Sequence, residues 1–88
     1  MIAVTPPPAI YQRYTGPGIE LQLPLSRVGA LCRMLGLKQD GLIAGCALWA
    51  IGGCLIVIPK IDGVSVDADA QQNVRRHAEA HCSGWHHK

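Results

Sequence analysis

The first part of the chain has the residue pattern of a strand followed by a helix. Residues 19–23 alternate between apolar and polar, which is the period of a half-buried strand with Glu20 and Gln22 facing water. Apolar residues then recur at helical spacing over residues 27–35, where Ser26 is placed as the N-cap. Each of the two elements is therefore predicted to pack one apolar face into a core.

The longest apolar stretch covers residues 42–58, seventeen residues without a charge. Its length lies at the lower limit for a membrane-spanning helix. Gly52 and Gly53 instead give the signal of a tight turn between two strand-forming runs, and Pro59 closes the second run. We therefore predict an antiparallel hairpin over about residues 43–60 and keep the membrane span as the alternative.

Both faces of this hairpin are apolar, so both need to be covered. With the two glycines as the loop, Cys46 and Cys54 fall on opposite faces, which argues against a disulfide between them. The hairpin could be covered by one helix on each face, or by one helix and a partner molecule. In the second arrangement the partner could be another copy of the chain, which would make a homodimer. The cross-strand neighbours in this register are Ile51 with Cys54, Trp49 with Ile56 and Ala47 with Ile58.

A second helix is predicted from about residue 70 to residue 82 or 83. Asp67 or Asp69 can cap its first turn, and Asp69 with Gln72 has the spacing of a capping box. The elements together predict an α+β domain with a short antiparallel sheet, a backing helix and a C-terminal helix.

One side of the second helix should face the hairpin. Ala78, Cys82 and Trp85 share that side by their spacing. The chain has four cysteines, which permit two disulfides without requiring any. Cys54 and Cys82 are the pair that we expect to be in contact, reduced or oxidised.

Composition limits the classes of function. Prolines and glycines predict an extended arm over residues 1–18, which leaves residues 19–88 as a single domain. A chain of this size buries only roughly 60–65% of its unfolded surface, so a metal or disulfides would help to stabilise it. The formal net charge of +2 is spread along the chain and only four aromatic residues are present, which gives no footprint for a nucleic acid.

All four histidines lie close to the end of the chain. His77 and His81 are four residues apart, so a helix places both imidazoles on one face. Gly84 can end that helix, and His87 can then supply a third nitrogen, with His86 as the alternative third ligand. Three nitrogens and one open position match the coordination of a catalytic Zn²⁺. The predicted metal ligands are His77, His81 and His87.

This spacing resembles the extended zinc signature of the metzincin metallopeptidases, His-Glu-x-x-His-x-x-Gly-x-x-His, through His77, His81, Gly84 and His87. Residues 76–85 also look like small bacterial and mobile-element proteins with an Arg-His-Glu-x-x-His-Cys-Asn-Gly-Trp motif. The resemblance implies a minimal zincin-like domain that holds Zn²⁺ on its C-terminal helix and hydrolyses peptides.

One departure from that pattern decides the expected activity. Ala78 stands where the family has the glutamate that polarises the zinc-bound water and carries its proton. Glu79 lies about 200° around the helix axis from His77, so it should point away from the ion and be a solvated surface residue. The chain is therefore predicted to be inactive as a hydrolase, either through natural loss of the glutamate or, as we favour, through its deliberate replacement.

The sequence thus predicts a zinc metallopeptidase-like domain with an empty catalytic position. Its partner would be a peptide or protein substrate, laid in extended form along the edge of the sheet. A zinc-stabilised binding module without catalysis is the first alternative, and a small membrane protein with a span at residues 42–58 is the second. No secretory signal is visible, and the bacterial cytoplasm and the periplasm both stay open as the compartment.

Overall fold

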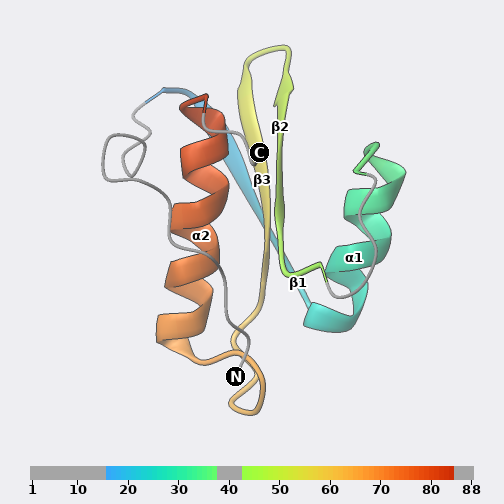
Figure 1. Cartoon of the computed structure of the whole chain (residues 1–88), viewed down its shortest axis with the longest axis vertical. Coiled ribbons are helices and arrows are strands. Elements are labelled where there is room, and N and C mark those ends of the chain that lie inside the picture. The colour runs from blue at the N-terminus through green and yellow to red at the C-terminus, as the bar shows by residue number, and fades with distance from the viewer. Residues whose placement is uncertain (1–15, 38–42, 85–88) are drawn as a thin grey trace.

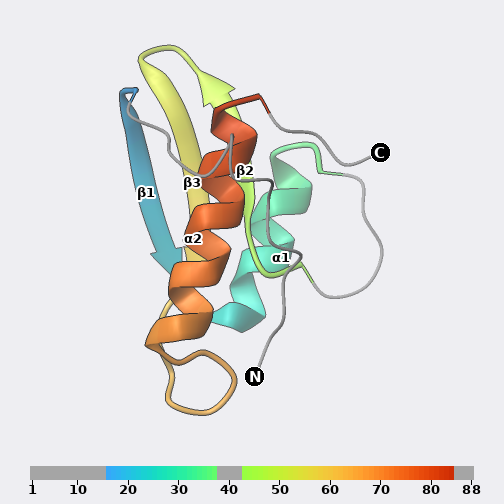
Figure 2. The same ribbon diagram turned by 60° about the vertical axis from the view of Figure 1, so that its left-hand side comes forward.

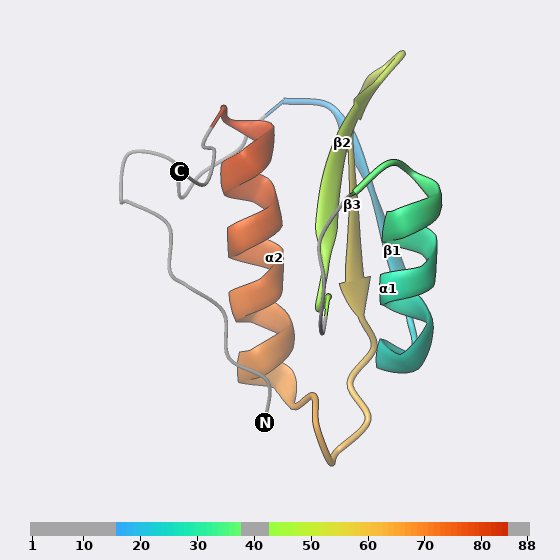
Figure 3. The same ribbon diagram turned by 45° about the vertical axis from the view of Figure 1, so that its right-hand side comes forward.

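The structure, a computed structural model, describes residues 16–37 and 43–84 and shows a three-stranded sheet between two helices. One helix lies on each face of the sheet (Figures 1 and 3). The expected α+β class is confirmed. The elements are β1 (Gly18–Leu23), α1 (Leu25–Met34), β2 (Cys46–Ala50), β3 (Gly53–Pro59) and α2 (Ala68–Cys82).

The sheet is mixed, with the strand order β1-β3-β2. β2 and β3 form the predicted antiparallel hairpin, but β1 pairs with β3 in parallel. The expectation of a purely antiparallel sheet was therefore wrong. β3 is apolar on both faces and becomes the central strand, so its second edge also needs a hydrogen-bonding partner, and β1 supplies it.

The hairpin register differs from the predicted one by two residues. Trp49, and not Ile51, lies opposite Cys54, so the loop consists of Ile51 and Gly52. Side chains in a strand alternate with a period of two, so this shift leaves every residue on its predicted face. Cys46 and Cys54 therefore lie on opposite faces, as expected.

Gly53 belongs to the strand because β1 begins directly against it. The carbonyl of Pro17 accepts a hydrogen bond from the N–H of Cys54 at 3.0 Å. A Cβ atom on Gly53 would lie 2.2 Å from that carbonyl oxygen, and the φ of Gly53 is +143°. Only a glycine lets the start of β1 approach β3 so closely.

Each face of the sheet has its own core and its own disulfide. Cys32–Cys46 joins α1 to β2, and Cys54–Cys82 joins β3 to α2, which confirms the pair expected from the sequence. One helix per face covers the hairpin. The core on the α1 side contains Val28, Cys32, Ile43 and Val57, and that on the α2 side contains Cys54, Ile56, Ile58, Val74, Ala78 and Cys82.

Asp67 caps α2, the first of the two predicted possibilities. Its Oδ1 atom accepts a hydrogen bond from the N–H of Ala70 at 2.7 Å. We expect Asp67→Ala to lower the free energy of unfolding by about 1 kcal/mol, as measured by urea denaturation. Asp69→Ala is the control and should lower the free energy of unfolding by only about 0.3 kcal/mol. A larger loss for Asp69→Ala would mean that the capping box, and not Asp67, holds the helix start.

Residues 46–58 of the stretch weighed as a membrane span, residues 42–58, belong to the hairpin of β2 and β3. Among residues 16–37 and 43–84, no helix has the length and apolar character needed to cross a membrane. Most of the expected arm over residues 1–18 lies outside the described residues, and its last residue, Gly18, already belongs to β1.

Candidate functional site

The two helical histidines lie together on α2, as the spacing predicts. The Nε2 atoms of His77 and His81 are 3.2 Å apart, and their ring centroids are 4.9 Å apart in an edge-on arrangement. Both side chains are half-buried. His86 and His87 lie outside the described residues, so the structure places two of the three predicted ligands.

The predicted zinc site is the main correction. Within the described part of the chain, no group of three or more His, Cys, Asp or Glu residues is arranged to hold a metal ion. Cys82, which follows His81, forms a disulfide with Cys54, so neither cysteine has a thiolate that zinc could bind. The expectations of a Zn²⁺ cofactor and of a metzincin-like zinc metalloprotease were therefore wrong for these residues.

Ala78, the position of the expected catalytic glutamate, faces the sheet. It is 2% exposed and packs in the α2-side core with Cys54 and Ile56 of β3. A helix that packs against a flat sheet needs small residues where it comes closest, which explains alanine at this position. In the structure, residue 78 therefore belongs to the core.

Glu79 is not the solvated residue that the sequence predicts. It is half-buried and shares a pocket of about 200 Å³ with Glu20. Burial raises the pKa of the Glu79 carboxyl, and repulsion from Glu20 adds to this effect, against the attraction of Arg75 and Arg76. The pocket lies between β1, β3 and the end of α2 and is lined by Gly16, Gly18, Ile19, Glu20, Cys54, Ile56, Glu79 and Cys82.

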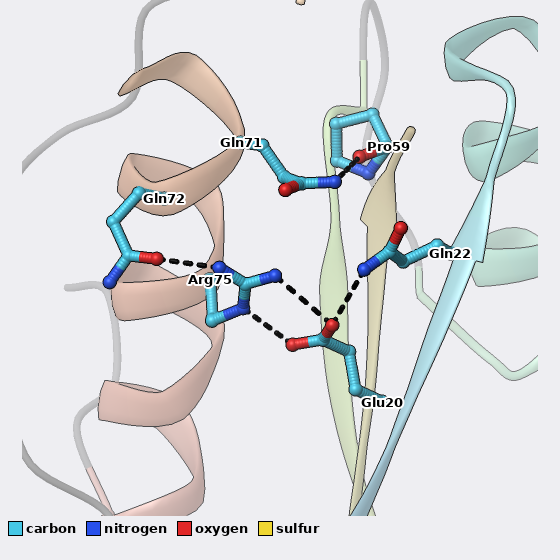
Figure 4. A network of polar contacts seen from close by, with 6 residues as sticks. All are labelled: Glu20, Gln22, Pro59, Gln71, Gln72 and Arg75. Carbon is cyan, nitrogen blue, oxygen red and sulfur yellow. Dashed lines mark hydrogen bonds and ion pairs between the residues drawn. The ribbon is translucent and has the colours of Figure 1, made fainter. Parts of the chain in front are cut away.

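Glu20 is held by a network between β1 and α2 (Figure 4). The Nε of Arg75 donates to its Oε1 at 2.5 Å, and another guanidinium nitrogen of Arg75 donates to its Oε2 at 3.1 Å. Gln22 donates to the same Oε2 at 2.8 Å, while Gln72 accepts from Arg75. The hydrogen bonds from Arg75 are the main cause of the lowered pKa of Glu20. Glu20 therefore stays ionised beside the half-buried Glu79.

Glu20 and Gln22 are exposed, as predicted, but the apolar residues of β1 are not buried as expected. The polar residues Glu20 and Gln22 lie on the α2 side, while Ile19 and Leu21 lie on the α1 side and are 70% and 38% exposed. An alternating strand allows either face to be covered, so the sequence alone could not decide between them. Arg75 of α2 is the signal that would have pointed to the observed choice.

The outer edge of β1 carries hydrogen-bonding groups that the sheet does not use. Pro17 and Leu23 accept from Cys54 and Lys60 of the β3 side at 3.0 and 2.8 Å. In a parallel ladder a residue points its N–H and C=O to the same side, and the side alternates along the strand. The odd-numbered residues of β1 therefore face β3, and Gly18, Glu20 and Gln22 face outward.

Within the described residues no strand lies beyond β1, which forms one outside edge of the sheet (Figure 2). β2 forms the other edge, where the register directs the backbone groups of only Ala47 and Trp49 outward. We call the backbone groups of Gly18, Glu20 and Gln22 the β1 edge.

No protein-family model, no curated protein and no solved structure matches this chain. The class of the protein therefore follows from the fold and the site. It is a small α+β domain with one disulfide on each face of the sheet and an open edge strand flanked by a pocket with two carboxylates.

Proposed function

We propose that the domain is a binding module that takes an extended segment of another protein as a fourth strand on the β1 edge. The observation that carries the proposal is the row of three outward-facing residues, which offers three N–H donors and three C=O acceptors. Peptides bind many proteins by adding a strand to such an edge, with affinity from the backbone and specificity from alternate side chains.

The apolar surface beside the edge supports the same use. Ile19, Leu55 and Leu48 follow one another across the three strands on the α1 side. Ile19 is 70% exposed and Leu48 is 38% exposed, and Leu21 extends the row along β1. An exposed edge strand with apolar side chains invites association, and a bound segment would cover both.

The two disulfides bear on where the module works. Cystine bridges persist in oxidising compartments and are rare in a reducing cytoplasm. Because a disulfide joins a helix to the sheet on each face, the domain would bind its partner segment in an oxidising compartment.

A short peptide with a variable centre tests the proposal. The probes are Thr-Val-X-Val-Thr peptides with blocked ends, in which X is Lys, Arg, Gln, Leu or Glu, titrated into the ¹⁵N-labelled domain. Val and Thr favour the extended state, and the five choices of X cover every charge. We expect at least one of them to shift the amide signals of Gly18, Glu20 and Gln22.

The matched variants are Gln22→Pro and Gln22→Ala. Proline removes an outward N–H and no ladder hydrogen bond to β3, whereas alanine removes the same side chain and keeps the N–H. Gln22→Pro should weaken binding about fivefold to tenfold, and Gln22→Ala should change it little. Equal binding by the two variants, or no binding of any of the five peptides, would overturn the proposed function.

A further inference from the structure

The pocket beside the β1 edge has an excess of negative charge. Among the lining residues that the structure describes, Glu20 and Glu79 are the charged ones, and none of them is Lys or Arg. Arg75 already neutralises Glu20 through two hydrogen bonds. The carboxylate of Glu79 has no hydrogen bond or ion pair with any residue that the structure describes, although it is half-buried. A cation in this pocket would therefore find a carboxylate that Arg75 and Arg76 attract only from a distance, without a direct ion pair.

The pocket borders β1. Gly16 and Gly18 line it without side chains, and Glu20 lines it from β1 with a side chain that projects to the α2 side. A segment added to the edge would lie about 4.8 Å beyond β1. Lysine and arginine have stems long enough to pass over one strand with the charge at the far end.

The strand geometry determines which residue of the segment meets the pocket. A residue directly opposite Glu20 points its side chain to the α2 side, and its two neighbours point to the α1 side, where Ile19 and Leu21 are exposed. On the basis of the proposed function, we infer that the bound segment has the pattern apolar–cationic–apolar, with its Lys or Arg opposite Glu20 and in contact with Glu79.

The charge of the whole chain cannot produce this preference. The formal net charge is +2, so the general field of the protein would favour an acidic peptide over a basic one. A preference for Lys would therefore have to come from the local pair of carboxylates. A hydrogen bond to a charged, half-buried group predicts a gain of about five- to tenfold in affinity for Lys over Gln at position X.

The test compares the dissociation constants of the Lys, Gln and Glu peptides for three forms of the domain. In the wild type we expect the order Lys, Gln, Glu from tightest to weakest. Glu79→Gln keeps the size of the side chain and should bring the ratio of Lys to Gln close to one. Asp69→Asn removes an exposed charge at the other end of α2 and should leave the ratio unchanged.

The outcomes separate this inference from the proposed function. Equal affinity for Lys and Gln in the wild type, or a preference that survives Glu79→Gln, would overturn the inference. If these peptides still bind and still lose affinity in Gln22→Pro, the edge is used and only the chemistry assigned to the pocket is wrong. If none of the peptides binds, the proposed function falls as well.

Discussion

Ala78→Glu is expected to destabilise the domain by more than about 3 kcal/mol, because the new carboxylate would be placed in an apolar core. Ala78 is 2% exposed and packs against β3 beside the Cys54–Cys82 disulfide. The larger side chain must also push α2 away from the sheet, which adds the cost of overpacking. Urea denaturation, monitored by circular dichroism, measures the loss of unfolding free energy. The measurement is made at about neutral pH, where an exposed carboxyl is charged.

Asn73→Glu is the matched control, since it adds the same side chain at an exposed position of the same helix. It should change the free energy of unfolding by less than about 0.5 kcal/mol. If Ala78→Glu had the same free energy of unfolding as this control, its carboxylate would have to be in contact with water. Residue 78 would then lie in a solvent-accessible site and not in the core. Gain of peptide hydrolysis by Ala78→Glu would likewise contradict the placement of residue 78 in the core.

Loss of the disulfides is the second large effect. In the chain-entropy description, a bridge that closes a loop of this length stabilises a protein by about 3 kcal/mol. The bridged cysteines are 14 residues apart in Cys32–Cys46 and 28 apart in Cys54–Cys82. Removal of both should cost about 6 kcal/mol, which is comparable to the whole stability of many small domains. We therefore expect the reduced protein to be largely unfolded at about 25 °C.

Amide dispersion in ¹H–¹⁵N spectra with and without reductant measures this loss directly. The double variant Cys54→Ala/Cys82→Ala is the matched form that keeps Cys32–Cys46, and it should retain part of its structure at a lower midpoint of unfolding. A reduced protein with an unchanged midpoint would show that the two cores suffice without the bridges.

The features that follow local rules could be predicted from the sequence. Alternation over the hairpin assigned Cys46 and Cys54 to opposite faces, and helical spacing directed Cys82 toward the sheet. The pair Cys54–Cys82 followed from these two patterns. The sequence offered Asp67 and Asp69 as possible N-caps of α2, and Asp67 is the residue that caps the helix in the structure.

The features that depend on distant contacts could not be predicted. The strand pattern of residues 19–23 is the same whichever face is covered, and the contact with Arg75, 55 residues beyond Glu20, decides the orientation. The hairpin loop moved because Gly53 is needed for the close approach of Pro17. The spacing of His77 and His81 correctly put two imidazoles together, but spacing cannot supply a third ligand or show that neighbouring cysteines are oxidised.

Hydrogen exchange of the β1 amides tests most directly whether the β1 edge receives a partner strand. With the Lys peptide bound, the N–H groups of Gly18, Glu20 and Gln22 should exchange at least about tenfold more slowly, because each would gain a hydrogen bond or lose contact with water. The N–H groups of Ile19 and Leu21 already face β3 and should change much less. Unchanged exchange at the three outward amides, or protection confined to the edge of β2, would contradict the proposal that the β1 edge receives the partner.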